Sequence, residues 1–131
     1  MLQVIKNNRK IYSIIIRKKF KYNGIKFFTP NDFSQQLGYM SRPKNYIIKP
    51  HRHKKVKRSV NFTQEVLFVK SGKVEVSFYN HRNVVFKKVF LLSGDIILLA
   101  NGGHSFKMLK KTEMIEVKQG PYKSDKDKIF I

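Results

Sequence analysis

The chain has 131 residues, 41% of them hydrophobic, and carries 28 Lys and Arg against 8 Asp and Glu, a formal net charge of +20. This length suits one domain over residues 1–131, and the apolar content can fill a core, which excludes wholesale disorder. The absence of cysteine excludes disulfides, zinc fingers and thiol catalysis. With no apolar run near the ~18–20 residues of a membrane span or long enough for a secretory signal, we expect a cytoplasmic protein with no membrane partner.

The first third of the chain has mostly strand-like periodicity. Residues 11–20 (IYSIIIRKKF) and 24–29 (GIKFFT) are rich in Ile and Phe, and the Asn-Gly pair at 23–24 between them is a strong type I′ turn signal. A hairpin is therefore predicted across this pair. Residues 31–40 are ambiguous, because a short helix would also fit, but Gly38 and the flanking strands favour a turn followed by a strand.

Alternation of apolar and polar residues is clearer in the second half of the chain. The sequence predicts two strands joined at Ser71-Gly72, then further strands separated by turns at 93–95 and 101–103. Their sequences are QEVLFVKSGKVEVSFYN, NVVFKKVFLL, IILLA, HSFKMLK and EMIEVK. The tail at 119–131 is polar until its last three residues, which are apolar and could dock on a second subunit. Many short strands with regular turns predict an all-β sandwich or barrel with little helix.

The positive charge is concentrated in the first half of the chain. Residues 1–64 hold 16 basic residues and a single acid, Asp32, whereas residues 65–131 hold 12 basic and 7 acidic residues. A field of this sign attracts nucleic acid, anionic membranes or anionic metabolites. The alternative is a Lys-rich solvated surface that follows from overall composition.

Two of the four histidines lie in the sequence His51-Arg52-His53. In an extended segment, residues i and i+2 point to the same side with their Cα atoms about 6.5–7 Å apart, so both imidazoles could reach one metal ion. A lone pair of this spacing in a basic loop also arises by chance, so the pattern is weak evidence by itself.

Glu65 and His104 are the other candidate ligands. Glu65 alternates with apolar Leu67 and Val69, and His104 alternates with Phe106 and Met108, so both side chains are predicted to point toward the core. An inward carboxylate needs a partner, which a metal ion or imidazoles would supply. The alternatives are a hydrogen-bonded core histidine at 104 and a lysine partner for Glu65.

These residues and their spacing resemble the two motifs of the cupin superfamily. The first is HxH at 51–53 followed by Glu65, six residues and Gly72, and the second runs from Gly94 through a buried strand and a glycine turn to His104. The resemblance covers about residues 36–118. The stretches TQEVLFVKSGKVEV, LLSGDIILLANGGHSFKM and EMIEVKQGPY look like a group of small bacterial cupins, some of which occur with sugar and surface-polysaccharide biosynthesis.

The resemblance implies a double-stranded β-helix, or jelly roll, with short N-terminal strands, and a homodimer. It also implies that His51, His53, Glu65 and His104 bind a divalent metal inside the barrel. The sequence departs from the family pattern in two places. Eleven residues, instead of three or four, separate His53 from Glu65, and Leu99 or Ala100 replaces the usual proline of the second motif. The inserted residues 54–64 are expected to form a longer loop beside the site.

Imidazoles and a carboxylate suit Fe, Mn, Ni, Cu or Zn, and four protein ligands leave positions open for a substrate oxygen. Oxygenase, isomerase or epimerase, lyase and ligand-sensing functions all remain open. The basic residues next to the HxH motif favour an anionic or sugar-derived substrate. The residues expected to contact it are Gln64, Arg52, Lys54, Tyr39, Phe106 and Tyr122. The alternatives are a solvated loop for the basic residues and a structural role for Tyr39, Gln64 and Tyr122.

Two alternatives use no metal. One is a nucleotide-sugar isomerase or epimerase in which the histidines are acid and base groups. The other is a non-enzymatic module that binds a ligand or nucleic acid through the +20 charge. Nucleic-acid binding is the less favoured reading here, since the chain has no recognised nucleic-acid motif and no tryptophan.

Overall fold

The computed structural model describes the backbone of residues 1–131 and every side chain except that of Asp125. Within these residues the secondary structure is all-β apart from one short 3₁₀ helix, η1 (Ser124–Asp127), as the sequence predicts. The strands are β1 (Leu2–Asn7), β2 (Lys10–Ile16), β3 (Gly24–Phe27), β4 (Gly38–Ser41), β5 (Glu65–Ser71), β6 (Lys73–Tyr79), β7 (Val85–Leu92), β8 (Ile96–Leu99), β9 (Gly103–Met108) and β10 (Glu113–Lys118). No helix in the described part of the chain is long and apolar enough to cross a membrane.

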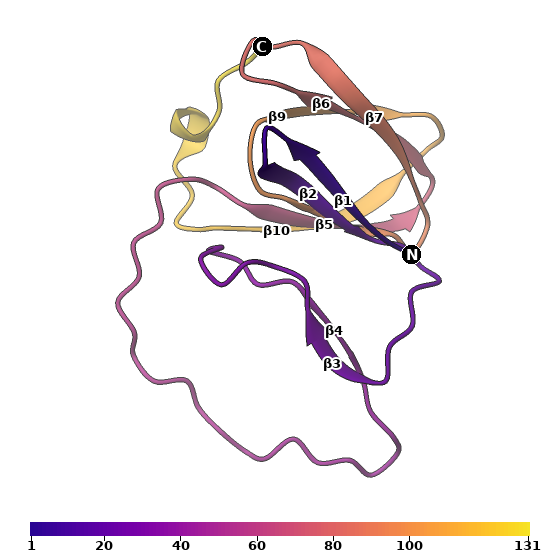
Figure 1. Ribbon diagram of the computed structural model, residues 1–131, viewed down its shortest axis with the longest axis vertical. Coiled ribbons are helices and arrows are strands. Elements are labelled where there is room, and N and C mark those ends of the chain that lie inside the picture. The colour runs from indigo at the N-terminus through magenta and orange to yellow at the C-terminus, as the bar shows by residue number, and fades with distance from the viewer. The chain divides into compact units, whose positions relative to one another are not determined.

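The chain divides into two compact units, one made of Met1–Phe20 with Thr63–Ile131 and the other of Lys21–Phe62. The first unit holds two antiparallel sheets, a five-stranded one in the order β1-β2-β8-β5-β10 and a three-stranded one in the order β7-β6-β9. Figure 1 shows β6 and β7 in one layer and β5 and β10 in the other. Among the described strands neither sheet closes on itself, so the jelly roll stays a prediction. Because the chain divides into two units, the single domain over residues 1–131 stays a prediction as well.

The core of the first unit forms where the apolar faces of the two sheets meet. Leu67 and Val69 on β5 share one hydrophobic cluster with Val76 and Phe78 on β6 and with Ile97 on β8. Val69, Val76, Phe78 and Ile97 are fully buried. Burial stabilises the fold by roughly 1.5–3 kcal/mol for each such side chain. The period-2 alternation in the sequence therefore places the inward positions of these strands correctly.

The hairpin predicted between residues 11–20 and 24–29 is wrong. β2 pairs with β1 and with β8, and β3 pairs with β4. The turn between β1 and β2 is made by Asn8 and Arg9, both at positive φ (51° and 65°), which is the backbone conformation that an Asn-Gly pair was expected to supply later in the chain. β2 ends at Ile16 because the next two residues are held by the carboxylate of Asp95.

Asp95, at the end of the turn that leads into β8, is a buried carboxylate with several hydrogen-bond donors. It is 4% exposed and accepts hydrogen bonds from the backbone N–H groups of Lys18 (2.9 Å) and Leu92 (2.8 Å) and from the Arg17 guanidinium (3.0 Å). The same guanidinium donates to the carbonyl of Phe90 and to the side chain of Gln3. The ends of β1, β2, β7 and β8 are thereby joined at one point.

The turn between β8 and β9 depends on a glycine. Gly102 has φ +73°, and a Cβ at this position would clash with the ring of Tyr12, which is itself buried. Only glycine therefore lets β9 begin at Gly103, directly before His104.

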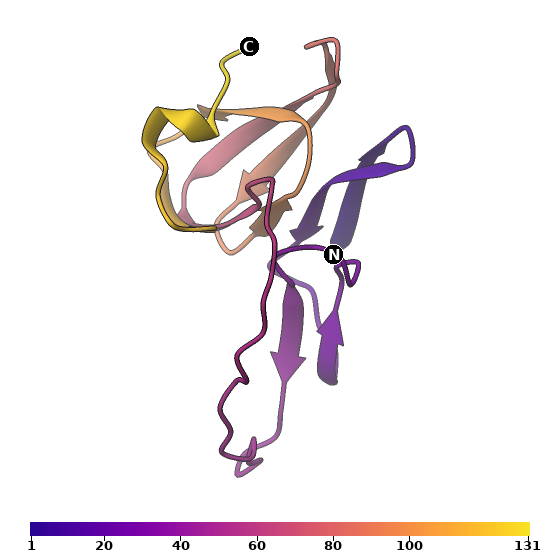
Figure 2. The ribbon, with the colours of Figure 1, turned by 90° about the vertical axis from the view of Figure 1, so that its left-hand side faces the viewer.

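The second unit is a two-stranded ribbon of β3 and β4 followed by a long segment without strand or helix. The loop between the strands is closed by Gln36, which accepts a hydrogen bond from Thr29 (2.7 Å) and donates to the carbonyl groups of Pro30 and Phe33 (both 2.9 Å). Residues 42–62 then run on in irregular backbone, and every one of them is exposed. Figure 2 shows this stretch as a continuous coil leaving β4.

We predict that Asp95→Asn lowers the free energy of unfolding by about 2–4 kcal/mol, because it removes the charge that Arg17 faces and replaces an acceptor with a donor in a buried network. Glu113→Gln is the matched control: it also removes one paired carboxylate, but the Lys70–Glu113 pair is 3.8 Å long and exposed, so about 0.5 kcal/mol or less is expected. Urea unfolding followed by circular dichroism measures both. Equal effects would contradict the role given to Asp95.

Candidate functional site

Glu65 and His104, which are far apart in sequence, lie within hydrogen-bond distance and link the two sheets of the first unit. The Oε1 atom of Glu65, the first residue of β5, lies 3.0 Å from Nε2 of His104 on β9. Their side chains are 14% and 30% exposed. Glu65 lies on the face of β5 that carries the buried Leu67. The pair therefore lies at the rim of the core, where water still has access.

The electrostatics of the pair keep Glu65 ionised. Its pKa is lowered to about 2, mainly by the hydrogen bond from His104. Burial opposes this shift, while a hydrogen bond with Glu116 and the charges of His104 and Lys118 reinforce it. A carboxylate with so low a pKa is a persistent anion, available as a metal ligand or as the partner of an imidazolium.

Glu116 and Lys118 on β10 complete the surroundings of Glu65, and the sequence did not single them out. Lys118 lies opposite Glu65 in the β5–β10 register, and Glu116 lies opposite Leu67. The pKa of Glu116 is raised because its carboxyl hydrogen bonds to Glu65, because it is partly desolvated and because Glu65 is negative. The alternation of Met114, Glu116 and Lys118 within EMIEVK was the signal that could have placed both residues on the inner face.

Two carboxyl groups with pKa values displaced in opposite directions thus lie beside an imidazole, an arrangement found both in functional sites and in structural ion-pair networks. Phe106 lies next to this group, with its ring centroid 5.5 Å from that of His104. The ring is half-buried against the core cluster. The cluster thus has one apolar wall, as small-molecule sites commonly do.

His51 and His53 form the other predicted pair, and both lie exposed in the second unit. Their ring centroids are 5.5 Å apart, so the two imidazoles lie side by side as the spacing predicts. The Nδ1 atom of His51 is 2.7 Å from the carbonyl oxygen of Lys49. Because a carbonyl only accepts, Nδ1 donates, which leaves Nε2 as the free lone pair of the neutral ring.

The donors fit a transition metal within each pair. Two ligand atoms that each bind a metal at about 2.0–2.2 Å in adjacent positions lie about 3 Å apart, which is the distance between Glu65 and His104. A His51 ring that donates Nδ1–H to a carbonyl is oriented as metal-bound histidines usually are. Among the described residues, however, no group of three or more His, Asp or Glu is arranged to hold an ion. The structure presents the four predicted ligands as two pairs, one in each unit.

The predicted substrate-contact residues fall into both units. In the first unit, Gln64 is buried, with its backbone N–H donating to the side chain of Gln119 (2.5 Å), whereas Tyr122 is 79% exposed. In the second unit, Tyr39 is half-buried on β4, and both Arg52 and Lys54 are exposed. Of the six residues predicted to contact substrate, the structure places Phe106 in ring contact with His104.

No family model matches the chain, and searches of curated proteins and of solved structures find no significant match. The resemblance to the cupins therefore depends on the motifs alone. Two features of the fold are compatible with this resemblance, namely the all-β architecture and the contact between Glu65 and His104.

We predict that Glu65→Gln lowers the free energy of unfolding of the metal-free protein at pH 7 by about 1–3 kcal/mol. Because the pKa of Glu65 is lowered, its carboxylate stabilises the fold above the ordinary value of 4.5, and this contribution is lost as the pH falls toward 2. The difference between the two proteins should therefore shrink steadily over that range. Urea unfolding at a series of pH values measures this difference in stability, and Glu75→Gln is the control. A difference that is independent of pH would refute the stabilising role assigned to the Glu65 carboxylate.

We predict the opposite sign for Glu116→Gln. The raised pKa of Glu116 means that its protonated form is the favoured one, so the ionised carboxylate opposes folding at pH 7. A glutamine keeps a hydrogen-bond donor toward Glu65 and cannot ionise. The free energy of unfolding of the metal-free protein should rise by about 0.5 kcal/mol at pH 7 and be unchanged near pH 3, where the native carboxyl is itself protonated. A loss of stability at pH 7 would contradict the pairing.

Proposed function

We propose that this protein is a small metal-binding cupin that binds or transforms an anionic or sugar-derived small molecule. In this proposal the jelly roll brings His51 and His53 to Glu65 and His104, and the four side chains hold one divalent Fe, Mn, Ni, Cu or Zn ion. The observation that carries it is the 3.0 Å approach of Glu65 and His104, because these two residues come from separate motifs of the family pattern.

The state of each donor supports metal binding. Glu65 is ionised over the whole physiological range because its pKa is about 2. His51 donates Nδ1–H to Lys49 and so offers Nε2 as a lone pair. His53 lies beside it with its ring exposed. Glu65 and His104 would exchange their mutual hydrogen bond for the ion, whereas the rings of His51 and His53 are exposed.

A bound ion of this type would supply Lewis-acid or redox chemistry. The residues of the chain have their own parts in the proposal. Glu116 would add a second carboxyl group beside the site, with its pKa raised by the neighbouring Glu65. Lys118 adds a positive charge next to Glu65, and the ring of Phe106 adds an apolar contact to His104. The basic residues around the HxH motif would attract an anionic substrate.

We expect near one transition-metal ion per chain in protein purified without chelator, measured by elemental mass spectrometry. His51→Ala, Glu65→Ala and His104→Ala should each lower metal occupancy at least tenfold, because four ligands share the ion. His81→Ala is the matched control, since His81 lies exposed in a turn, and it should retain the metal. Circular dichroism establishes that each variant is folded. Full metal occupancy in a folded His104→Ala protein would show that His104 is not a metal ligand.

A second candidate function is a metal-free isomerase or epimerase of the nucleotide-sugar type. It is favoured by the contact of Glu65 with both His104 and Glu116, which brings an imidazole and two carboxyl groups to one place. The measurement is deuterium uptake from D₂O into a panel of nucleotide sugars, followed by NMR in the presence of chelator. Uptake that is lost in Glu65→Gln would favour this function over metal binding, and no uptake in chelator would remove it.

The assembly and location are also proposals. By analogy with other small cupins we propose a homodimer in the cytoplasm. The terminal residues Ile129, Phe130 and Ile131 are 95%, 92% and 61% exposed in the single chain, and an interface would cover such apolar side chains. Light scattering after size exclusion gives the assembly state directly.

A further inference from the structure

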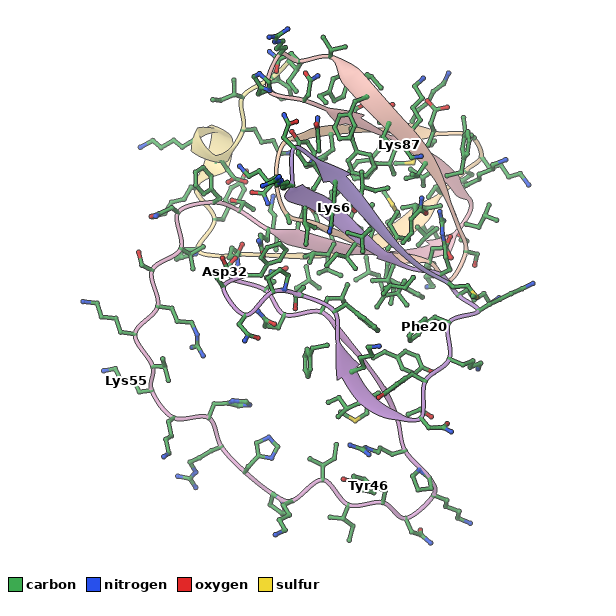
Figure 3. The ribbon with its side chains drawn as sticks, viewed as in Figure 1. Lys6, Phe20, Asp32, Tyr46, Lys55 and Lys87 are labelled. Carbon is green, nitrogen blue, oxygen red and sulfur yellow. The ribbon has the colours of Figure 1, made fainter. Side chains whose placement is uncertain are left out.

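The longest irregular segment of the protein is also its most cationic one. Residues 42–62, named here the basic arm, have no strand or helix, and every residue is exposed. The arm carries eight Lys and Arg and no acid. These are Arg42, Lys44, Lys49, Arg52, Lys54, Lys55, Lys57 and Arg58. Figure 3 shows the side chains of the arm, with Tyr46 and Lys55 labelled, directed away from its backbone.

The charge of the arm is not neutralised within the chain. In the part of the chain that the structure describes, no carboxylate forms an ion pair with any of the eight arm cations. The second unit as a whole contains a single acid, Asp32. A run of like charges repels itself and gains most from a polyanion that displaces its counterions, which is the energetic basis of nucleic-acid binding.

Exposed aromatic rings accompany these cations. Tyr46 is 50% exposed, and the guanidinium of Arg42 lies 4.5 Å from its ring centroid. At the start of the same unit, Tyr22 is 41% exposed, with the ammonium group of Lys26 at 5.4 Å. Phe62, at the end of the arm, is 79% exposed. A ring with one face open and a cation beside it can stack a base while the cation contacts the adjoining phosphate.

We propose that the basic arm binds single-stranded nucleic acid, with its Lys and Arg side chains on the phosphates and Tyr46 stacked on a base. A single strand is favoured over a duplex because stacking needs bases that are free of their neighbours. An anionic membrane fits less well, because Pro50 interrupts any helix over the whole arm and so keeps Ile47 and Ile48 off a helical face shared with Val56. Neighbouring Ile47 and Ile48 point to opposite sides of an extended chain. This inference is independent of the metal site.

The test is fluorescence anisotropy of the full chain with labelled 20-nucleotide mixed-sequence single strands of RNA and DNA. If five or more phosphates are contacted, affinity should fall about 100-fold between 50 and 200 mM salt. The quadruple variant K54Q/K55Q/K57Q/R58Q should bind at least about tenfold more weakly. The matched control K110Q/K111Q/K123Q/K128Q changes the net charge equally at exposed lysines outside the arm and should retain most of the affinity.

Tyr46→Ala separates stacking from charge. It should weaken binding about fivefold or more while leaving the salt dependence unchanged, because no phosphate contact is removed. His104→Ala should bind the oligonucleotide as the native protein does, so a failure of the metal site leaves this result intact.

Three results would overturn the proposal. The first is a dissociation constant weaker than about 100 μM at 50 mM salt, where even nonspecific nucleic-acid binding should be tighter. The second is an equal loss of affinity in the two quadruple variants, which would show that binding depends on net charge and not on the arm. The third is preferential binding to phosphatidylserine vesicles over oligonucleotide, lost in the arm variant, which would assign the arm to an anionic membrane.

Discussion

The strands of the first unit meet where the buried carboxylate of Asp95 receives two backbone N–H groups and the guanidinium of Arg17. A buried carboxylate is stable only when its oxygens are fully used, so the segments that supply these donors must arrive together. Those segments are the end of β2 and the end of β7, and Arg17 adds β1 through Gln3. This polar junction joins strands of both sheets.

The junction also fixes the register on which the candidate site depends. The backbone of Asp95 and Gly94 bonds to Val69 of β5, which sets β8 against β5 with Leu67 opposite Ile97. Glu65 then lies opposite Leu99, at the rim of the core. A slip of one residue would turn Glu65 to the other face of the sheet and away from His104.

The two polar features of the first unit differ in what they do for the protein. Asp95 is buried and accepts three hydrogen bonds from donors that hold the strand ends, which is a structural role. Glu65 and Glu116 share a hydrogen bond at the rim, where one carboxyl is held ionised and the other is driven toward protonation. Both displacements arise because the two carboxyl groups and His104 lie close together at a partly buried position.

The sequence by itself determined the strands of the second half of the chain and the inward direction of Glu65 and His104, because alternation with a period of two is a property of the local chain. It also showed that His51 and His53 can lie side by side, since residues i and i+2 share a face in any extended segment. The wrong hairpin at 23–24 shows the limit of local sequence patterns. A turn residue specifies a backbone conformation, but it does not specify that the strands on its two sides pair with each other.

Only the tertiary structure decided which strands pair and which charged groups meet. The contact of Glu65 with Glu116, and the joining of Arg17 to Asp95, link residues that are far apart in the chain, and no local pattern encodes them. Their energies arise from burial and mutual charge, which exist only after the sheets have packed. The face of a strand on which each side chain lies can therefore be predicted from the sequence. The pairing of β2 with β8 and the ionisation of Glu65 are consequences of the assembled fold.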